Sequence, residues 1–145
     1  MNILFFITPK NEVAYIDDTC SLRQAIEKME YHQYTAVPVL DGKGRYIGTL
    51  TEGDLLRELK MHHDLSLHDA EDVRVARIDR SRKMKPVGVD VDIEDLIQVS
   101  MRQNFVPVID DNGVFIGIIT RKAIIEYCYE HSDLKKEKEC VKSSN

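Results

Sequence analysis

Residues 37–56 read VPVLDGKGRYIGTLTEGDLL, and residues 106–125 read VPVIDDNGVFIGIITRKAII. At this constant offset of 69 residues, eight of the twenty positions are identical, and five of the other twelve exchange one apolar residue for another. The chain therefore contains an internal repeat. Each copy is ~60 residues long, which is near the lower limit for burying a core without disulfides or a metal. We expect the two copies to share one core and to leave a ligand-binding cleft between them.

The same order of elements is expected in each copy from the apolar periodicity, the helix-capping residues and the glycine-containing turns. Strands are predicted over residues 13–16, 36–40 and 46–50 and again over 86–89, 105–109 and 114–119, and helices over 22–29, 52–59, 93–101 and 121–129. This order, strand-helix-strand-strand-helix given twice, predicts an α+β fold in which helices cover one face of each small sheet.

The repeat divides the chain into four segments. Residues 1–60 hold the first copy, residues 61–72 form a polar connector and residues 73–130 hold the second copy, which a short helix over 73–78 is expected to open. Residues 131–145 are charged and poor in apolar side chains. We expect this tail to fray from the last helix into disorder.

Composition excludes several classes of function. With 20 basic and 25 acidic residues the formal net charge is −5, which does not favour nucleic acid or anionic membranes as partners. The first seven residues have too short an apolar run for a signal peptide or a membrane span, so a cytoplasmic protein is expected. No catalytic motif is present, and we expect no enzyme.

Cysteines and histidines give no metal or disulfide pattern. Cys20, Cys128 and Cys140 are an odd number without close spacing, which is typical of reduced thiols. The histidines at 62, 63 and 68 are not arranged as zinc ligands are, because neither a cysteine nor a further ligand stands at zinc-like spacing from the adjacent pair at 62 and 63. No metal site is expected, and these histidines are interpreted as part of a solvated connector.

The duplicated pattern resembles the CBS domain pair, the regulatory module of cystathionine β-synthase. The resemblance covers nearly the whole chain and is carried by the two aliphatic-Pro-aliphatic strands and by Gly, two further residues and Thr at 48–51 and 117–120. It implies tandem CBS repeats packed about a pseudo-twofold axis. It further implies a stand-alone homodimer that senses an adenine nucleotide without catalysis and signals to a regulated protein.

The first copy matches the ribose motif of that family in full, from Gly48 to Asp54. The Thr51 hydroxyl and the Asp54 carboxylate are three residues apart at the start of a helix, so they lie near one another. Free N–H groups at a helix start favour phosphate, and a carboxylate can accept both hydroxyl protons of a ribose diol. Thr-x-x-Asp is also a good helix cap, and this alternative stays open.

The second copy keeps Thr120 but carries Ala123 in place of the carboxylate, with Arg121 and Lys122 between them. It therefore lacks the diol-binding group, whereas its two cations suit phosphate. The alternative for both is a pair of solvated charges on an exposed helical turn.

The family resemblance implies two nucleotide sites, each built from both repeats. The main one joins Thr120, Arg121 and Lys122 to Ala14, Tyr34, Thr35, Ala36 and Pro38. The weaker one joins Thr51 and Asp54 to Val87, Asn104, Phe105, Val106 and Pro107. Tyr34 would stack on a purine or, alternatively, only cover the sheet edge. In the weaker site Glu52 would repel phosphate, and only the basic stretch at 80–85 could offset it.

Residues 34–41 and 120–122 are also similar to small bacterial CBS proteins that bind cyclic di-AMP, although Glu12 and Lys122 depart from the residues usual there. Because the 3′ oxygens of a cyclic dinucleotide are esterified, it offers no vicinal diol, which fits the missing carboxylate at 123. The ligand is therefore expected to be cyclic di-AMP or AMP, ADP or ATP. The alternative function is a dimerisation module with vestigial clefts.

Overall fold

The computed structural model describes residues 3–61, 73–77, 84–132, 137–138 and 140–141. The helices are α1 (Leu22–His32), α2 (Glu52–Met61), α3 (Ile93–Ser100) and α4 (Arg121–Glu130), with short 3-10 turns η1 (Ile3–Phe5), η2 (Lys10–Glu12) and η4 (Val75–Arg77). The strands are β1 (Thr8–Pro9), β2 (Ile16–Asp17), β3 (Ala36–Leu40), β4 (Tyr46–Thr51), β5 (Val87–Gly88), β6 (Phe105–Ile109) and β7 (Phe115–Thr120). The α+β prediction is confirmed.

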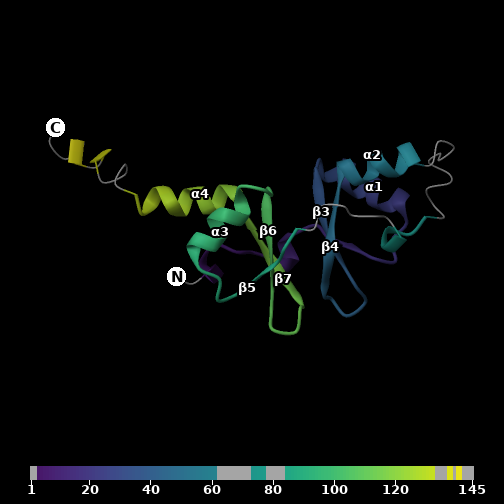
Figure 1. The fold of residues 1–145 in the computed structure, drawn as a ribbon, viewed down its shortest axis with the longest axis horizontal. Coiled ribbons are helices and arrows are strands. Elements are labelled where there is room, and N and C mark those ends of the chain that lie inside the picture. Colours follow the sequence, from purple (N-terminus) through teal and green to yellow (C-terminus); the bar gives the residue numbers. More distant parts are fainter. Residues whose placement is uncertain (1–2, 62–72, 78–83, 133–136, 139, 142–145) are drawn as a thin grey trace.

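Two sheets stand next to each other in the middle of the molecule, and the helices of each repeat lie on its outer side (Figure 1). One sheet has the order β2-β3-β4 and the other β1-β7-β6-β5. In each, a short strand runs parallel to the proline-containing strand, which pairs antiparallel with the strand after it. The two halves therefore repeat one topology, as the duplicated sequence predicts.

The predicted boundaries hold for the central strands and fail for the short ones. β3 and β6 begin and end where the apolar runs do. The strand predicted over 13–16 is only Ile16–Asp17, because Val13 donates its N–H to Lys10 O and closes η2 instead. The strand predicted over 86–89 is only Val87–Gly88. Short apolar runs in this chain therefore overestimate the length of the strands that they contain.

Helix starts follow their capping residues. Ser21 and Gln24 form a reciprocal capping box at α1, with the Gln24 N–H 3.1 Å from Ser21 Oγ and the Ser21 N–H 2.9 Å from Gln24 Oε1. Asp92 accepts the N–H of Asp95 at 2.9 Å and caps α3. α1 ends at Gln33, which adopts a left-handed conformation with φ 56°.

The core consists of two apolar clusters rather than the single one expected. One contains Ile16, Leu22, Ala25, Met29, Val37, Val39, Leu50 and Val75, and the other Ile3, Leu96, Val106, Val108, Ile119 and Ile124. Each cluster fills the space between one sheet and its own helices. The reason is the position of the helices, which cover the outer face of each sheet and bury the apolar side chains there.

The two repeats exchange their leading segments. Ile3, at the start of the first repeat, is fully buried in the cluster of the second, and β1 pairs antiparallel with β7. In return Val75, at the start of the second repeat, is buried in the cluster of the first. This exchange was not predicted from the sequence, and it ties the halves together more firmly than a simple side-by-side contact.

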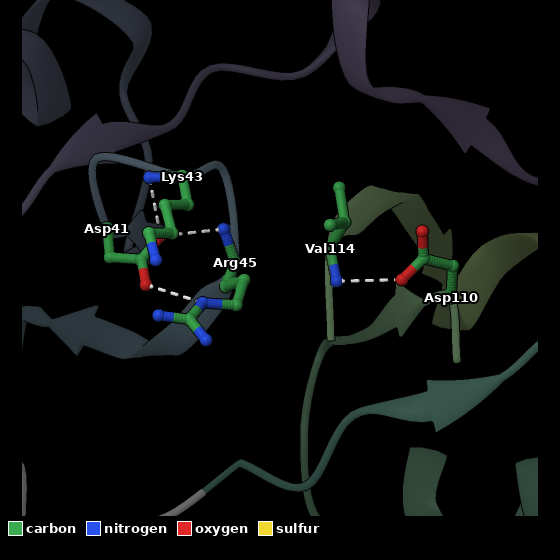
Figure 2. A network of polar contacts seen from close by, with 5 residues as sticks. All are labelled: Asp41, Lys43, Arg45, Asp110 and Val114. Atoms are coloured by element: carbon green, nitrogen blue, oxygen red, sulfur yellow. Dashed lines mark hydrogen bonds and ion pairs between the residues drawn. The ribbon is translucent and has the colours of Figure 1, made fainter. Parts of the chain in front are cut away.

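The hairpin turns of the two repeats are also bonded to each other. Asp41 accepts the N–H groups of Lys43 and Arg45 at 2.9 Å, and Asp110 accepts that of Val114 at 2.9 Å (Figure 2). Arg45 and Val114 form a β-bridge between the turns. The aspartates therefore shape two equivalent turns that close the seam between the sheets.

Several predictions fall outside the described residues. They concern most of the 61–72 connector with its histidines at 62, 63 and 68, residue 78 of the short helix, and most of the basic stretch at 80–85. Most of the tail at 131–145 also lies outside.

Candidate functional site

Thr51 and Asp54 cap α2 reciprocally. The Asp54 N–H donates to Thr51 Oγ1 at 3.2 Å, and the Thr51 N–H donates to Asp54 Oδ2 at 2.9 Å. Arg57, one turn further on, donates from Nη2 to Asp54 Oδ1 at 3.2 Å. The Asp54 side chain is only 1% exposed. The capping alternative is thus present in this structure, and both carboxylate oxygens have partners.

The equivalent helix start in the second repeat is built differently. Thr120 Oγ1 accepts the N–H of Ala123 at 3.1 Å, but Ala123 has no carboxylate to return the bond. Arg121 donates from Nε to Ser100 O at 2.8 Å and so braces the end of α3. Lys122 is 85% exposed, with its Nζ 4.0 Å from Glu126 Oε1. Of the two cations, Arg121 is held in place and Lys122 extends into solvent.

A cleft of about 1210 Å³ lies between the two repeats. The first repeat contributes the start of β3 and the first turns of α2, and the second contributes the end of α3 and the loop that follows it. Its lining residues are Thr35, Ala36, Thr51, Glu52, Gly53, Arg57, Met84, Lys85, Gln98, Val99, Met101, Arg102, Gln103 and Asn104. This volume exceeds the range of typical small-molecule pockets, roughly 300–1,000 Å³.

Backbone hydrogen bonds hold both walls of the cleft. The Glu52 N–H donates to Thr35 O at 3.0 Å, and at the equivalent place in the other repeat the Arg121 N–H donates to Asn104 O at 2.9 Å. Gln103 is 8% exposed and donates from Nε2 to Phe105 O at 3.0 Å. Each helix start is therefore fixed to the residue just before the proline-containing strand of its own repeat, β3 or β6.

The charge of the cleft differs from the sequence-based expectation. Arg57, Lys85 and Arg102 line it, against the single carboxylate of Glu52. From the sequence we expected Glu52 to repel phosphate here, with only the basic stretch at 80–85 to offset its negative charge. The two arginines were missed because each belongs to a helix or helix end whose direction is not readable from local sequence. Because Arg57 is ion-paired to Asp54, the excess of positive charge over Glu52 comes from Lys85 and Arg102, and this excess suits an anion.

The predicted site residues are distributed as follows. Thr35 and Ala36, assigned to the main site, line the same cleft as Thr51 and Asn104, which were assigned to the weaker one. Pro38, Val106 and Pro107 are buried in their strands, and Ala14, Val87 and Phe105 are half-buried. Tyr34 is 38% exposed and stacks on His32, with ring centroids 5.2 Å apart.

Across the described residues, no hydrogen bond, ion pair or ring contact joins Tyr34, Thr35 or Ala36 to the segment 120–122. The same portion of the chain contains no cluster of three or more His, Cys, Asp or Glu that could hold a metal. Nor does it contain a helix with the length and apolarity needed to cross a bilayer.

The CBS domain family model matches residues 7–61 and 75–130. The chain belongs to the CBS domain family. It is a CBS pair, and CBS domains are generally regulatory rather than catalytic modules. The two matched segments correspond to the two repeats read from the sequence.

Solved structures share this fold. A CBS domain protein from Streptococcus pneumoniae is 29% identical, with a TM-score of 0.77 over 89% of this chain and 88% of that one. CbpB in complex with c-di-AMP is 21% identical, with a TM-score of 0.81 over 94% and 91%. CBSX2 in complex with AMP is 22% identical, with a TM-score of 0.70 over 89% and 96%. Similar CBS proteins thus bind adenine nucleotides.

Proposed function

We propose that this CBS pair is a non-catalytic regulatory module that binds an adenine nucleotide in the cleft between its repeats. The observation that carries the proposal is the cationic lining of that cleft, where Lys85 and Arg102 outnumber the carboxylate of Glu52 and Arg57 is paired with Asp54. The start of α2 adds backbone N–H groups, which favour phosphate. Complexes of similar folds with c-di-AMP and with AMP make these the first ligands to test.

The proposal assigns roles to named residues. Arg102 and Lys85 would neutralise phosphate, and Thr51 would donate its hydroxyl to it. Asn104 and Thr35 present amide and hydroxyl groups that suit the edge of a purine. Met101 is 73% exposed and can cover a flat ring. The site predicted at Thr120, Arg121 and Lys122 stays a second proposal, with Arg121 as its fixed cation.

Calorimetric titration with AMP, ADP, ATP and cyclic di-AMP tests this function. Arg102→Ala should weaken the ligand that binds by about 10-fold or more, on the scale of a lost charge-assisted hydrogen bond of about 1.5–3 kcal/mol. Lys43→Ala, which removes the same charge from the exposed turn outside the cleft, should leave affinity unchanged. Absence of heat and of a thermal shift with all four nucleotides would reject the proposal.

Self-association is the second part of the proposal. Leu56 on α2 and Ile125 on α4 occupy equivalent repeat positions and are 67% and 60% exposed. Two apolar side chains related by the pseudo-twofold axis fit a symmetric homodimer, in which ligand binding would stabilise one geometry for a partner protein to recognise. A dimer that ignores every nucleotide would instead favour the alternative of a dimerisation module.

A further inference from the structure

We propose that Arg121 is a positioning residue for the cleft between the repeats, because it holds both ends of the loop that forms one of its walls. This loop comprises residues 101–104, and all four of them line the cleft, whereas Arg121 is not part of the lining. The inference rests on the proposed function and deepens it, since it names a residue that acts on the ligand through others.

Arg121 reaches the loop from the start of α4 by two hydrogen bonds. Its backbone N–H donates to Asn104 O at 2.9 Å, and its side-chain Nε donates to Ser100 O at 2.8 Å. Ser100 is the last residue of α3 and Asn104 comes directly before β6, so the two carbonyls stand at the two ends of the loop. Because Ser100 is only 8% exposed, little water can replace the guanidinium as a donor to this carbonyl.

The side-chain bond compensates for the way in which α3 ends. The equivalent helix α1 ends at Gln33 in a left-handed conformation, which brings backbone N–H groups back to the carbonyls of the last turn. α3 ends instead at Met101 in a right-handed conformation, with φ −67°. The guanidinium of Arg121 supplies a donor there, and its positive charge matches the negative end of the helix dipole. Glu52, at the position of Arg121 in the first repeat, has a carboxylate with no N–H to donate.

The loop carries three of the groups that the proposed function assigns to the ligand. They are the thioether of Met101, the guanidinium of Arg102 and the amide of Asn104, whereas Gln103 is buried. Binding is stronger when the backbone that carries such groups is already ordered, because less conformational entropy is then lost. Arg121 should therefore raise affinity in the cleft through the loop that it holds.

A matched pair of variants isolates the bond to Ser100. Gln has its amide nitrogen at the same place along the side chain as Nε of Arg, Met has a methyl group there, and neither is charged. In the ligand-free chain, amide hydrogen exchange of residues 101–104 should match the wild type in Arg121→Gln and be at least about 10-fold faster in Arg121→Met. Lys43→Met, which removes a cation from the exposed turn outside the cleft, should exchange as the wild type does. Equal exchange in the two Arg121 variants would overturn the inference.

Nuclear magnetic resonance of the wild-type chain gives a measurement that does not depend on the folding of a variant. The Nε–H proton of Arg121 should exchange with water at least about 10-fold more slowly than that of free arginine, because it is engaged with Ser100 O. Exchange as fast as in free arginine would overturn the inference.

Calorimetry with AMP and cyclic di-AMP extends the test to binding. Arg121→Met should bind at least about 5-fold more weakly than Arg121→Gln. The comparison cancels any contribution of the guanidinium charge, since both variants lack it. Equal affinities of the two variants would overturn the inference and leave the proposed function intact. No binding of either nucleotide by the wild-type chain would overturn both.

Discussion

Tyr46 and Phe115 occupy the same position in the two repeats, and each donates its backbone N–H to a glycine of the other repeat. The Tyr46 N–H is 3.1 Å from Gly113 O, and the Phe115 N–H is 2.9 Å from Gly44 O. Their rings stack with centroids 6.4 Å apart. The hydrogen bonds between the repeats therefore follow the same pseudo-twofold symmetry as the order of the strands and helices.

The ring of Phe115 should be essential to this seam because it is 1% exposed. Phe115→Ala removes a buried aromatic side chain and leaves a cavity, which costs about 3–5 kcal/mol of unfolding free energy. Urea denaturation measures the loss. Phe5→Ala, at a position 89% exposed, is the matched control and should change stability little. Equal effects of the two substitutions would contradict the packing described here.

Gly117 should tolerate no side chain, because the chain at Ile7 and Thr8, where β1 begins, lies directly against it. A Cβ there would lie 2.3 Å from Thr8 O and 3.0 Å from Ile7 Cγ1. Gly117→Ala is expected to displace β1 and to cost about 1–3 kcal/mol, the usual penalty of overpacking. Gly42→Ala is the control, since nothing lies within 4 Å of its Cβ position. Thermal denaturation compares the stability of the two variants. If Gly117→Ala is as stable as the wild type, the contact of β1 with β7, and with it the exchange of leading segments, is contradicted.

Asp41 should make stability depend on acid pH. Hydrogen bonds, first that from the Arg45 backbone N–H, hold the pKa of Asp41 below its usual value. Because the folded pKa is the lower one, this contribution is complete above the unfolded value of about 4 and is lost as the pH falls through the folded value.

Asp41→Asn should therefore lose less stability than the wild type between neutral and acid pH. The midpoint of urea denaturation at a series of pH values measures it. Asp111→Asn, in the equivalent turn, controls for the charge change and should follow the wild-type curve. Superimposable curves for Asp41→Asn and the wild type would exclude the role assigned to this carboxylate.

The proposed homodimer predicts that a charge on either helix surface weakens association. Leu56→Glu or Ile125→Glu should raise the dissociation constant by about 10-fold or more, since burying an unpaired carboxylate is costly. Sedimentation measures the change. Val89→Glu, at a loop position that is 40% exposed, is the control. If the control weakens the dimer and the helix variants do not, the interface lies elsewhere.

The repeat, the α+β order and the central strands could be predicted because they depend on local patterns. Strands β3 and β6 are continuous apolar runs bounded by turn residues, and Ser21 and Thr51 are good helix caps. The exchange of Ile3 and Val75 could not be predicted, because an apolar residue at the start of a repeat does not indicate which core receives it. The family resemblance supplied candidate residues of which Thr35, Ala36, Thr51 and Asn104 lie together in the cleft.

The chemistry of the cleft depends on directions that the sequence does not contain. Arg57 was not among the candidate residues, yet one turn of helix brings it back to Asp54 and into the cleft. Arg102 follows α3, and its approach to α2 depends on how the two repeats are docked. Charges that meet across a pseudo-twofold axis become visible only in three dimensions.

A crystal structure of the chain grown with AMP or cyclic di-AMP tests the central claim most directly. We predict nucleotide density between Thr51 and Asn104, with a phosphate in contact with Arg57 or Arg102. Density confined to the start of α4 beside Lys122, or no density at saturating nucleotide, would contradict it.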